Sequence, residues 1–199
     1  MKIGMFGGSF NPIHNGHIEL AKAMYKELKL DKLLIMPSYI PPHKFVDSAA
    51  FPDQRFEMCC LAAKDIDGFE VSNIEIKRQG ASYTYLTLKE LKAIYPEDEL
   101  YLLMGADMFM TLQDWKKPEV IFRLAEVCCV PRNDDDITKL SAQAEKLNKM
   151  GAKTRVLDAG VMTVSSTEIR RKVRNGEDIS GLVAASVEKY IKEHYLYRR

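Results

Sequence analysis

The chain has 199 residues, 46% of them hydrophobic, and this size suits one domain with a sizeable core. Its 29 Lys and Arg residues balance 28 Asp and Glu residues, and the net charge of +1 argues against binding to nucleic acid or a membrane surface. No apolar run approaches the roughly 18 residues of a membrane-spanning helix. The N-terminus lacks the apolar core of a signal peptide, and four cysteines in two adjacent pairs suggest no disulfide framework, which together predict a reducing, cytoplasmic location.

Apolar runs alternate with helical patterns along the whole chain. Strands are predicted at residues 2–6, 33–36, 70–71 with 74–76, 99–104, 127–130 and 155–157, and helices at 16–28, 53–63, 84–94, 118–123, 137–150, 166–174 and 183–193. This alternation predicts an α/β fold, a Rossmann-like, doubly wound and mostly parallel sheet with helices on both faces. Residues 1–199 are expected to form a single domain, with 165–199 as a small C-terminal helical part. Ligands of such sheets bind at the carboxyl ends of the strands.

The first predicted strand leads into a glycine turn and then a helix, and residues 4–17 read GMFGGSFNPIHNGH. This order builds a phosphate site, because glycine lets backbone N–H groups approach an anion and the helix start adds unpaired donors and a positive dipole end. His14 and His17 share one face of the helix start, where imidazole N–H groups donate well to phosphate oxygens. A zinc site, which needs further ligands, and a pair of ordinary surface histidines are the alternatives.

A second polar helix start lies near the other end of the chain. Residues 164–172 read VSSTEIRRK, in which hydroxyl groups beside Glu168 open a helix and Arg170 lies one turn along. On its own this pattern indicates an N-cap on a basic surface helix. The glycines near the N-terminus do not match the GxGxxG spacing of dinucleotide-binding dehydrogenases, and no GxxxxGK[ST] sequence of a P-loop occurs.

Together the two segments resemble a known family. Residues 8–17, GSFNPIHNGH, resemble the GSFxPxHxGH signature of nicotinate mononucleotide adenylyltransferases, which belong to a nucleotidyltransferase superfamily marked by (H/T)xGH. Residues 164–170 resemble the family's ISSTxxR motif, with Val164 in place of Ile. The resemblance implies catalytic roles for His14, His17 and Arg170. It implies that ATP is bound by Gly7, Gly8, Ser9, Phe10, His14, His17, Gly105, Asp107, Ser166, Thr167 and Arg170.

The resemblance also implies a set of acceptor-binding residues, namely Lys44, Tyr83, Thr84, Trp115 and Arg132. Two prolines stiffen the long loop 37–52 and aim Lys44 at phosphate, the alternative being a solvated lysine. The segments with Tyr83 and Trp115 resemble the family's pocket for the pyridine ring, where an aromatic face stacks on a flat heterocycle, although aromatic side chains also fill cores and Tyr85 is expected there. Arg132 meets a phosphate or is a solvated loop charge.

Two acidic segments have simpler interpretations. Asp107 follows Gly105 at the end of a predicted strand and is expected to cap a helix, and the resemblance implies that it also meets ribose hydroxyls. Residues 133–136, NDDD, are expected to form a turn and a helix cap rather than a metal site.

The resemblance implies transfer of AMP from ATP to nicotinate mononucleotide, giving deamido-NAD and pyrophosphate. The chain shows no Ser–His–Asp order and no activated cysteine, which favours direct in-line attack on the α-phosphorus. Mg²⁺ is expected to be carried mainly by the ATP phosphates, with no metal site of the protein's own. ATP and the mononucleotide are the expected partners, with no nucleic acid and no membrane, and a homo-oligomer is left open. A phosphopantetheine-type adenylyltransferase, usually shorter and marked by TxGH, and a non-catalytic nucleotide sensor are the alternatives.

Overall fold

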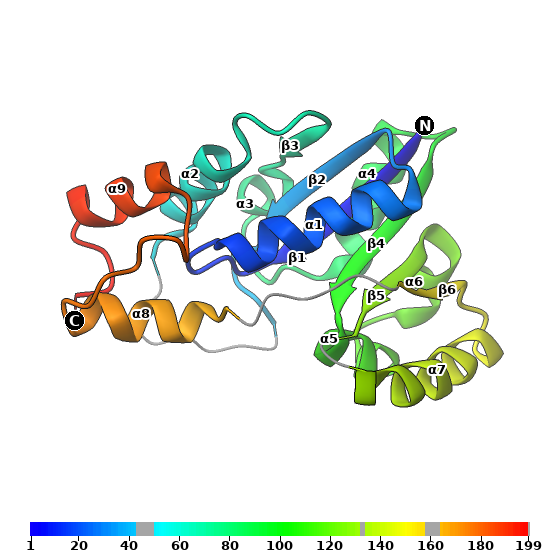
Figure 1. The fold of residues 1–199 in the computed structure, drawn as a ribbon. Coiled ribbons are helices and arrows are strands. Elements are labelled where there is room, and N and C mark those ends of the chain that lie inside the picture. Colours follow the sequence, from blue (N-terminus) through cyan, green and yellow to red (C-terminus); the bar gives the residue numbers. More distant parts are fainter. Residues whose placement is uncertain (43–49, 132–133, 158–163, 199) are drawn as a thin grey trace.

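A computed structural model describes residues 1–42, 50–131, 134–157 and 164–198 of the chain (Figure 1). Its centre is a six-stranded parallel sheet with the order β3-β2-β1-β4-β5-β6. The strands are β1 (Lys2–Gly8), β2 (Lys32–Pro37), β3 (Phe69–Val71), β4 (Glu99–Gly105), β5 (Glu126–Val130) and β6 (Thr154–Val156). The chain winds outward from β1 to β3, returns to the centre, and winds outward again from β4 to β6, so the predicted doubly wound Rossmann-like fold is confirmed.

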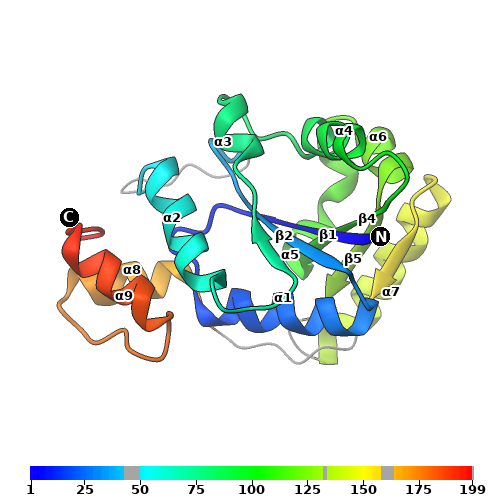
Figure 2. The same ribbon diagram turned by 90° about the horizontal axis from the view of Figure 1, so that it is seen from above.

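Helices cover both faces of the sheet (Figure 2). They are α1 (Asn15–Leu28), α2 (Pro52–Ala63), α3 (Ile74–Arg78), α4 (Thr84–Ile94), α5 (Ala106–Met110), the 3-10 helix η1 (Leu112–Asp114), α6 (Pro118–Leu124), α7 (Asp134–Lys149), α8 (Ser166–Arg174) and α9 (Ala185–Glu193). No helix among the described residues is long and apolar enough to cross a membrane.

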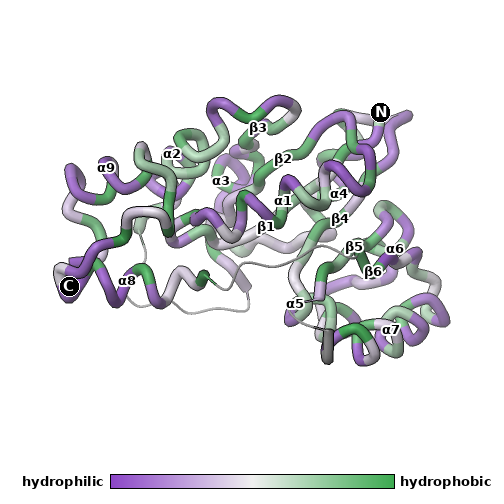
Figure 3. The backbone as a smooth tube through the Cα atoms, in the orientation of Figure 1, coloured by the Kyte–Doolittle hydropathy of each residue, from purple (hydrophilic) through white to green (hydrophobic). Residues whose placement is uncertain are grey.

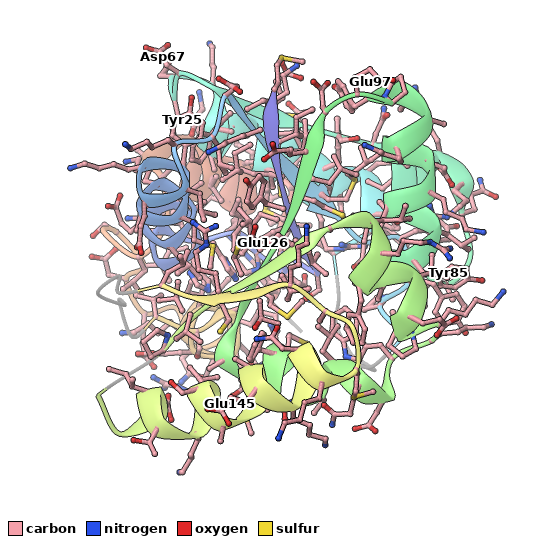
Figure 4. All side chains as sticks on the ribbon, turned by 90° about the vertical axis from the view of Figure 1, so that its right-hand side faces the viewer. Tyr25, Asp67, Tyr85, Glu97, Glu126 and Glu145 are labelled. Carbon is pink, nitrogen blue, oxygen red and sulfur yellow. The ribbon has the colours of Figure 1, made fainter. Side chains whose placement is uncertain are left out.

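Two hydrophobic clusters, one on each face, join these helices to the sheet. Alternation along a strand divides its side chains between the faces, so Phe6 packs with α1, α2, α8 and α9, whereas Met5 packs with α4, α5, α6 and α7. Tyr25 of α1 and Tyr85 of α4 accordingly lie on opposite sides of the sheet (Figure 4). The strands read as continuous apolar runs because both faces of the sheet are covered. Along α1 and α7, hydrophobic and hydrophilic stretches alternate instead, because only one face of each helix is buried (Figure 3).

The structure corrects two local predictions. Residues 74–76 are not a strand but the start of α3, since the sheet pairing of β3 ends at Val71. The alternation of Ile74 and Ile76 spans too few residues to separate a strand from a helix, and the side chain of Glu75 between them is buried. Asp107 is not a helix cap, because Gly105 occupies that position and Asp107 falls in the first turn of α5. A carboxylate in the first turn still meets the positive end of the helix dipole.

The topology places the carboxyl ends of the two central strands side by side. β1 and β4 are adjacent and parallel, and their carboxyl ends, near Gly8 and Gly105, precede α1 and α5. These helices lie on opposite faces of the sheet, so the crevice at this switch point is open for a ligand. The expectation that both glycine-containing turns reach the same edge of the sheet is therefore confirmed.

Candidate active site

A cavity of about 950 Å³ lies at the carboxyl ends of β1 and β4. Its volume is at the upper end of the range for small-molecule sites, enough for a substrate as large as a nucleotide. Most of the residues implied by the sequence line it: Gly7, Gly8, Ser9, Phe10, His14, His17, Tyr83, Thr84, Gly105, Trp115, Ser166, Thr167 and Arg170. Asp107 is exposed and is not among the lining residues, and Lys44 and Arg132 lie outside the described residues.

The two histidines form a stacked pair at the start of α1. Their ring centroids are 3.5 Å apart, with an interplanar angle of 22°. The backbone N–H of His17 donates to Nδ1 of His14 at 3.3 Å, and the backbone N–H of His14 donates to Nδ1 of His17 at 3.2 Å. Each Nδ1 is thus an acceptor, so a neutral ring carries its proton on Nε2. The reciprocal cap occupies both Nδ1 atoms, so Nε2–H is the ring donor of each histidine in its neutral form.

Burial sets the charge of His14. Its side chain is buried, and desolvation lowers its pKa from 6.5 to about 4. His14 is therefore a neutral donor at neutral pH. The edge of the Phe10 ring packs against His17 with centroids 5.1 Å apart. A Cβ at Gly8 would lie 2.9 Å from Cζ of Phe10, so glycine at this position lets the ring pack closely against the backbone.

The start of α8 is joined directly to the loop that follows β1. Ser165 caps the helix by accepting a hydrogen bond from the backbone N–H of Glu168 at 3.2 Å. The hydroxyl of Ser166 donates to the carbonyl of Pro12 at 3.0 Å. Residues at two helix N-termini from distant parts of the chain therefore line one cavity, where the positive ends of both helix dipoles favour an anion.

Arg170 lies between these two helix starts. Its Nη1 donates to the carbonyl of Asn11 at 2.8 Å, and its Nη2 donates to Oγ1 of Thr167 at 3.2 Å. Partial burial lowers the pKa of its guanidinium, which nevertheless stays protonated at neutral pH. The geometry fixes one edge of the guanidinium while the side chain lines the cavity.

The same loop is held from its other side by residues that the sequence analysis did not single out. Asn11 is buried, and its Oδ1 accepts from the hydroxyl of Tyr197 at 2.8 Å and from the backbone N–H of Ala50 at 3.1 Å. Burial raises the pKa of Tyr197, so its hydroxyl remains a donor. No local pattern reveals this contact, because the two side chains are 186 positions apart.

Arg55 is a second unpredicted support. Its buried guanidinium donates to the carbonyls of Ser9 at 2.6 Å, Ser38 at 2.5 Å, Tyr39 at 3.0 Å and Ala50 at 3.2 Å. It thereby ties the ends of β1 and β2 to the segment before α2. One signal was available in the sequence: an arginine within the buried face of a helix needs several acceptors, and backbone carbonyls at strand ends supply them.

The Tyr197 contact has a measurable expected effect on stability. Tyr197→Phe removes one buried hydrogen bond while Asn11 keeps the one from Ala50, so we expect the free energy of unfolding to fall by about 1 kcal/mol. Urea unfolding measures it. Tyr195→Phe is the matched control, because the Tyr195 side chain is 71% exposed and should leave stability unchanged. Equal stability of Tyr197→Phe and the native chain would contradict the role of this bond.

On the opposite side of the cavity, aromatic and polar side chains gather before α4 and after η1. Tyr83 and Thr84 open α4, and Trp115 follows η1 with its indole N–H donating to Oγ1 of Thr111 at 3.4 Å. The side chain of Trp115 is only partly buried, as expected for a residue near the surface, whereas Tyr85 belongs to the core, also as expected. Lys116, which the sequence analysis passed over, lines the cavity beside Trp115.

Among the residues that the structure describes, no group of three or more His, Cys, Asp or Glu side chains is placed to hold a metal ion. The acidic side chain on the described cavity wall is Glu75, which accepts a hydrogen bond from Oγ1 of Thr87 at 2.6 Å. Burial raises the pKa of Glu75 from its ordinary value.

Comparison with known proteins agrees with this geometry. A family model described as cytidylyltransferase-like matches residues 5–172. The chain is 36% identical over 198 residues to the "Probable nicotinate-nucleotide adenylyltransferase" of Clostridium tetani, with 99% of each chain covered. It is 39% identical over 213 residues to the protein of the same name from Citrifermentans bemidjiense, with 99% of this chain and 98% of the relative covered.

Solved structures support the fold. The nicotinic acid mononucleotide adenylyltransferase of Plasmodium falciparum, in complexes with APC and with NaAD, superposes with a TM-score of 0.78 at 18% identity. The superposition covers 98% of this chain and 96% or 97% of the other. Nucleotidyltransferases of this kind generally use a divalent metal. The family model and the full-length relatives together show that the chain is a nucleotidyltransferase that belongs to the nicotinate-nucleotide adenylyltransferase family.

Proposed function

We propose that this chain transfers AMP from ATP to nicotinate mononucleotide, giving deamido-NAD and pyrophosphate as a step of NAD biosynthesis. One observation carries the proposal: the stacked histidines of α1 and the start of α8 face one cavity and are joined through hydrogen bonds from Ser166 and Arg170 to the loop between them. Two helix starts beside a pair of imidazole side chains suit a polyphosphate chain better than a single phosphate.

The proposed ATP site uses the residues at these two helix starts. We assign to it Gly7, Gly8, Ser9, Phe10, His14, His17, Gly105, Asp107, Ser166, Thr167 and Arg170. His14 and His17 would donate through Nε2–H to the α-phosphate, where charge grows during transfer. Ser166, Thr167 and Arg170 would hold the β- and γ-phosphates. For Asp107, Lys44 and Arg132 the support is the family resemblance alone.

We propose a direct in-line displacement. A phosphate oxygen of the mononucleotide attacks the α-phosphorus, the bond from that phosphorus to the bridging oxygen breaks, and pyrophosphate leaves with the electron pair. The thiols support transfer without a covalent intermediate: burial raises the pKa of Cys128 and of Cys129 to about 12, so both stay protonated and unreactive. Mg²⁺ would enter as part of the ATP substrate, since it keeps several waters and favours phosphate oxygens.

The organisation of the chain is part of the proposal. Residues 1–199 would act as one nucleotidyltransferase domain, with 165–199 as its C-terminal helical part, because α8 and Tyr197 both hydrogen-bond to the loop after β1. We further propose a reducing, cytoplasmic compartment. The four cysteines support it, since all of them are free thiols.

A pyrophosphate-release assay with a panel of acceptors tests the function. We expect ATP-dependent release with nicotinate mononucleotide and little with phosphopantetheine. Faster turnover with phosphopantetheine would assign the chain to another adenylyltransferase activity. Binding of ATP with no release from any acceptor would indicate a nucleotide sensor and overturn the proposal.

A further expected result concerns the acceptor. We expect kcat/KM for nicotinate mononucleotide to exceed that for its nicotinamide form by roughly tenfold or more, about 1.4 kcal/mol. The start of α4 at Thr84 offers backbone N–H donors and a positive dipole end, which favour a carboxylate over a carboxamide. Trp115 would stack on the ring. Equal values for the two acceptors would refute this selectivity and leave the adenylyl transfer intact.

A further inference from the structure

Lys116 brings a positive charge to the part of the cavity opposite α8. It lies in the segment between η1 and α6, next to Trp115, and its Nζ is 4.2 Å from the centroid of the Tyr83 ring. Lys116, Trp115, Tyr83 and Thr84 all line the cavity. A lysine ammonium over an aromatic face is attracted by the ring quadrupole, so Tyr83 keeps this mobile charge at the cavity wall.

The lysine and arginine charges of the described cavity wall separate into two regions. Its lysine and arginine side chains are Lys116 and Arg170, and Arg170 is tied to Asn11 and Thr167 at the start of α8. Lys116 belongs instead to the side of α4 and α6, which Figure 2 shows well apart from α8. The two cations therefore cannot serve the same group of a substrate. If Arg170 faces the phosphates of ATP, Lys116 faces a different anionic group.

We propose that Lys116 is a specificity-determining residue that recognises the carboxylate on the pyridine ring of the acceptor. This inference rests on the proposed function, because it assigns the aromatic side of the cavity to the ring. An ammonium attracts a carboxylate and gives much less to a neutral carboxamide, which also presents an NH₂ donor toward it. Lys116 thus adds a mobile point charge to the fixed backbone donors at the start of α4.

Lys117 provides a matched control. It carries the same charge one position along, but its Nζ lies 5.2 Å from the ring centroid of Tyr85, and it is not among the residues that line the cavity. Lys116 and Lys117 are both exposed, so replacing either with Gln should leave the fold intact. Both variants change the net charge by the same amount, and a difference between them reports position rather than overall charge.

The experiment compares kcat/KM for nicotinate and nicotinamide mononucleotide in the native chain, Lys116→Gln, Lys116→Arg and Lys117→Gln. We expect Lys116→Gln to lower the ratio of the two values by about tenfold, mainly through a higher KM for the nicotinate form, with the KM for ATP unchanged. Lys116→Arg keeps the charge and should stay within about threefold of the native ratio, a difference of less than 1 kcal/mol. Lys117→Gln should match the native chain.

The outcomes separate this inference from the proposed function. No release of pyrophosphate by the native chain with either acceptor would refute the function. Two results would refute only the role of Lys116. One is normal turnover of Lys116→Gln with the native ratio of kcat/KM for the two acceptors. The other is normal turnover of the native chain with a ratio near one. An equal loss for both acceptors would mean that Lys116 contacts a group they share, such as the phosphate, and would also overturn the assignment.

Discussion

We expect His17→Ala to lower kcat for adenylyl transfer by about 100-fold or more, the usual loss when one oriented donor to a transition-state anion is removed. ATP binding should weaken far less, because the α-phosphate gains its extra charge only during transfer. The expectation follows from the reciprocal cap, in which Nδ1 of His17 accepts from the backbone N–H of His14, so Nε2 is the ring nitrogen left to donate an N–H to phosphate. Pyrophosphate release measures kcat, and calorimetry measures ATP affinity.

His17 also has a structural role, and two further variants separate it from the chemical one. Asn places its amide oxygen close to the position of Nδ1, so His17→Asn retains the acceptor for the backbone N–H of His14 while it loses the Nε2–H donor. Gln reaches one atom further, so His17→Gln restores an N–H donor near Nε2. We expect Asn to be as slow as Ala and Gln to recover part of the rate.

Two results would count against the catalytic role of His17. Normal turnover in His17→Asn together with slow turnover in His17→Ala would mean that the ring acts only as a helix cap. Thermal melts of each variant are the control for folding, since loss of a cap costs about 1 kcal/mol. A rate loss explained by unfolding would appear as a lowered melting temperature.

The predictability of this fold follows from the range over which each signal acts. β1, β2, β4 and β5 are buried on both faces, so their apolar runs are continuous and easily recognised. Residues 74–76 are helical although their sequence predicts a strand, because three residues cannot distinguish a period of two from one of 3.6. The start of α1, which follows β1, and the start of α8 both carry short-range capping patterns. For this reason the sequence predicts most of the residues of the candidate site.

The supports of the site were not visible, for a physical reason. Arg55 binds carbonyls of the segments that follow β1 and β2, and the partner of Asn11 is Tyr197 near the C-terminus. Backbone carbonyls carry no sequence signature, and contacts between distant residues arise only when the chain folds. The stacked arrangement of His14 and His17 also goes beyond their predicted spacing, because it depends on Nδ1 atoms that bind the backbone.

For Arg170→Ala we expect ATP affinity to fall by about 10- to 100-fold, as for the loss of a charge-assisted hydrogen bond of about 1.5–3 kcal/mol. AMP affinity should change by less than about threefold. The reason is that Arg170, one turn into α8, reaches back to Thr167 at the helix start, where the β- and γ-phosphates are proposed to bind, and AMP lacks both groups. Arg171→Ala is the matched control, since Arg171 lies on the same helix, pairs with Glu177 at the exposed surface and does not line the cavity.

The hydrogen bond from Arg170 to the carbonyl of Asn11 offers a competing, purely structural explanation. Loss of that bond would disturb the loop that leads into α1 and its two histidines, and it would therefore weaken ATP and AMP alike. Arg170→Lys helps to separate the two, because lysine keeps the positive charge but lacks the fork that binds Asn11, Thr167 and phosphate together. If Arg170 acts on the phosphates, Lys retains part of the preference for ATP over AMP that Ala abolishes. Calorimetry with both nucleotides decides the matter: an equal loss of ATP and AMP affinity in Arg170→Ala would make Arg170 a support of the loop and leave the β- and γ-phosphates to the start of α8.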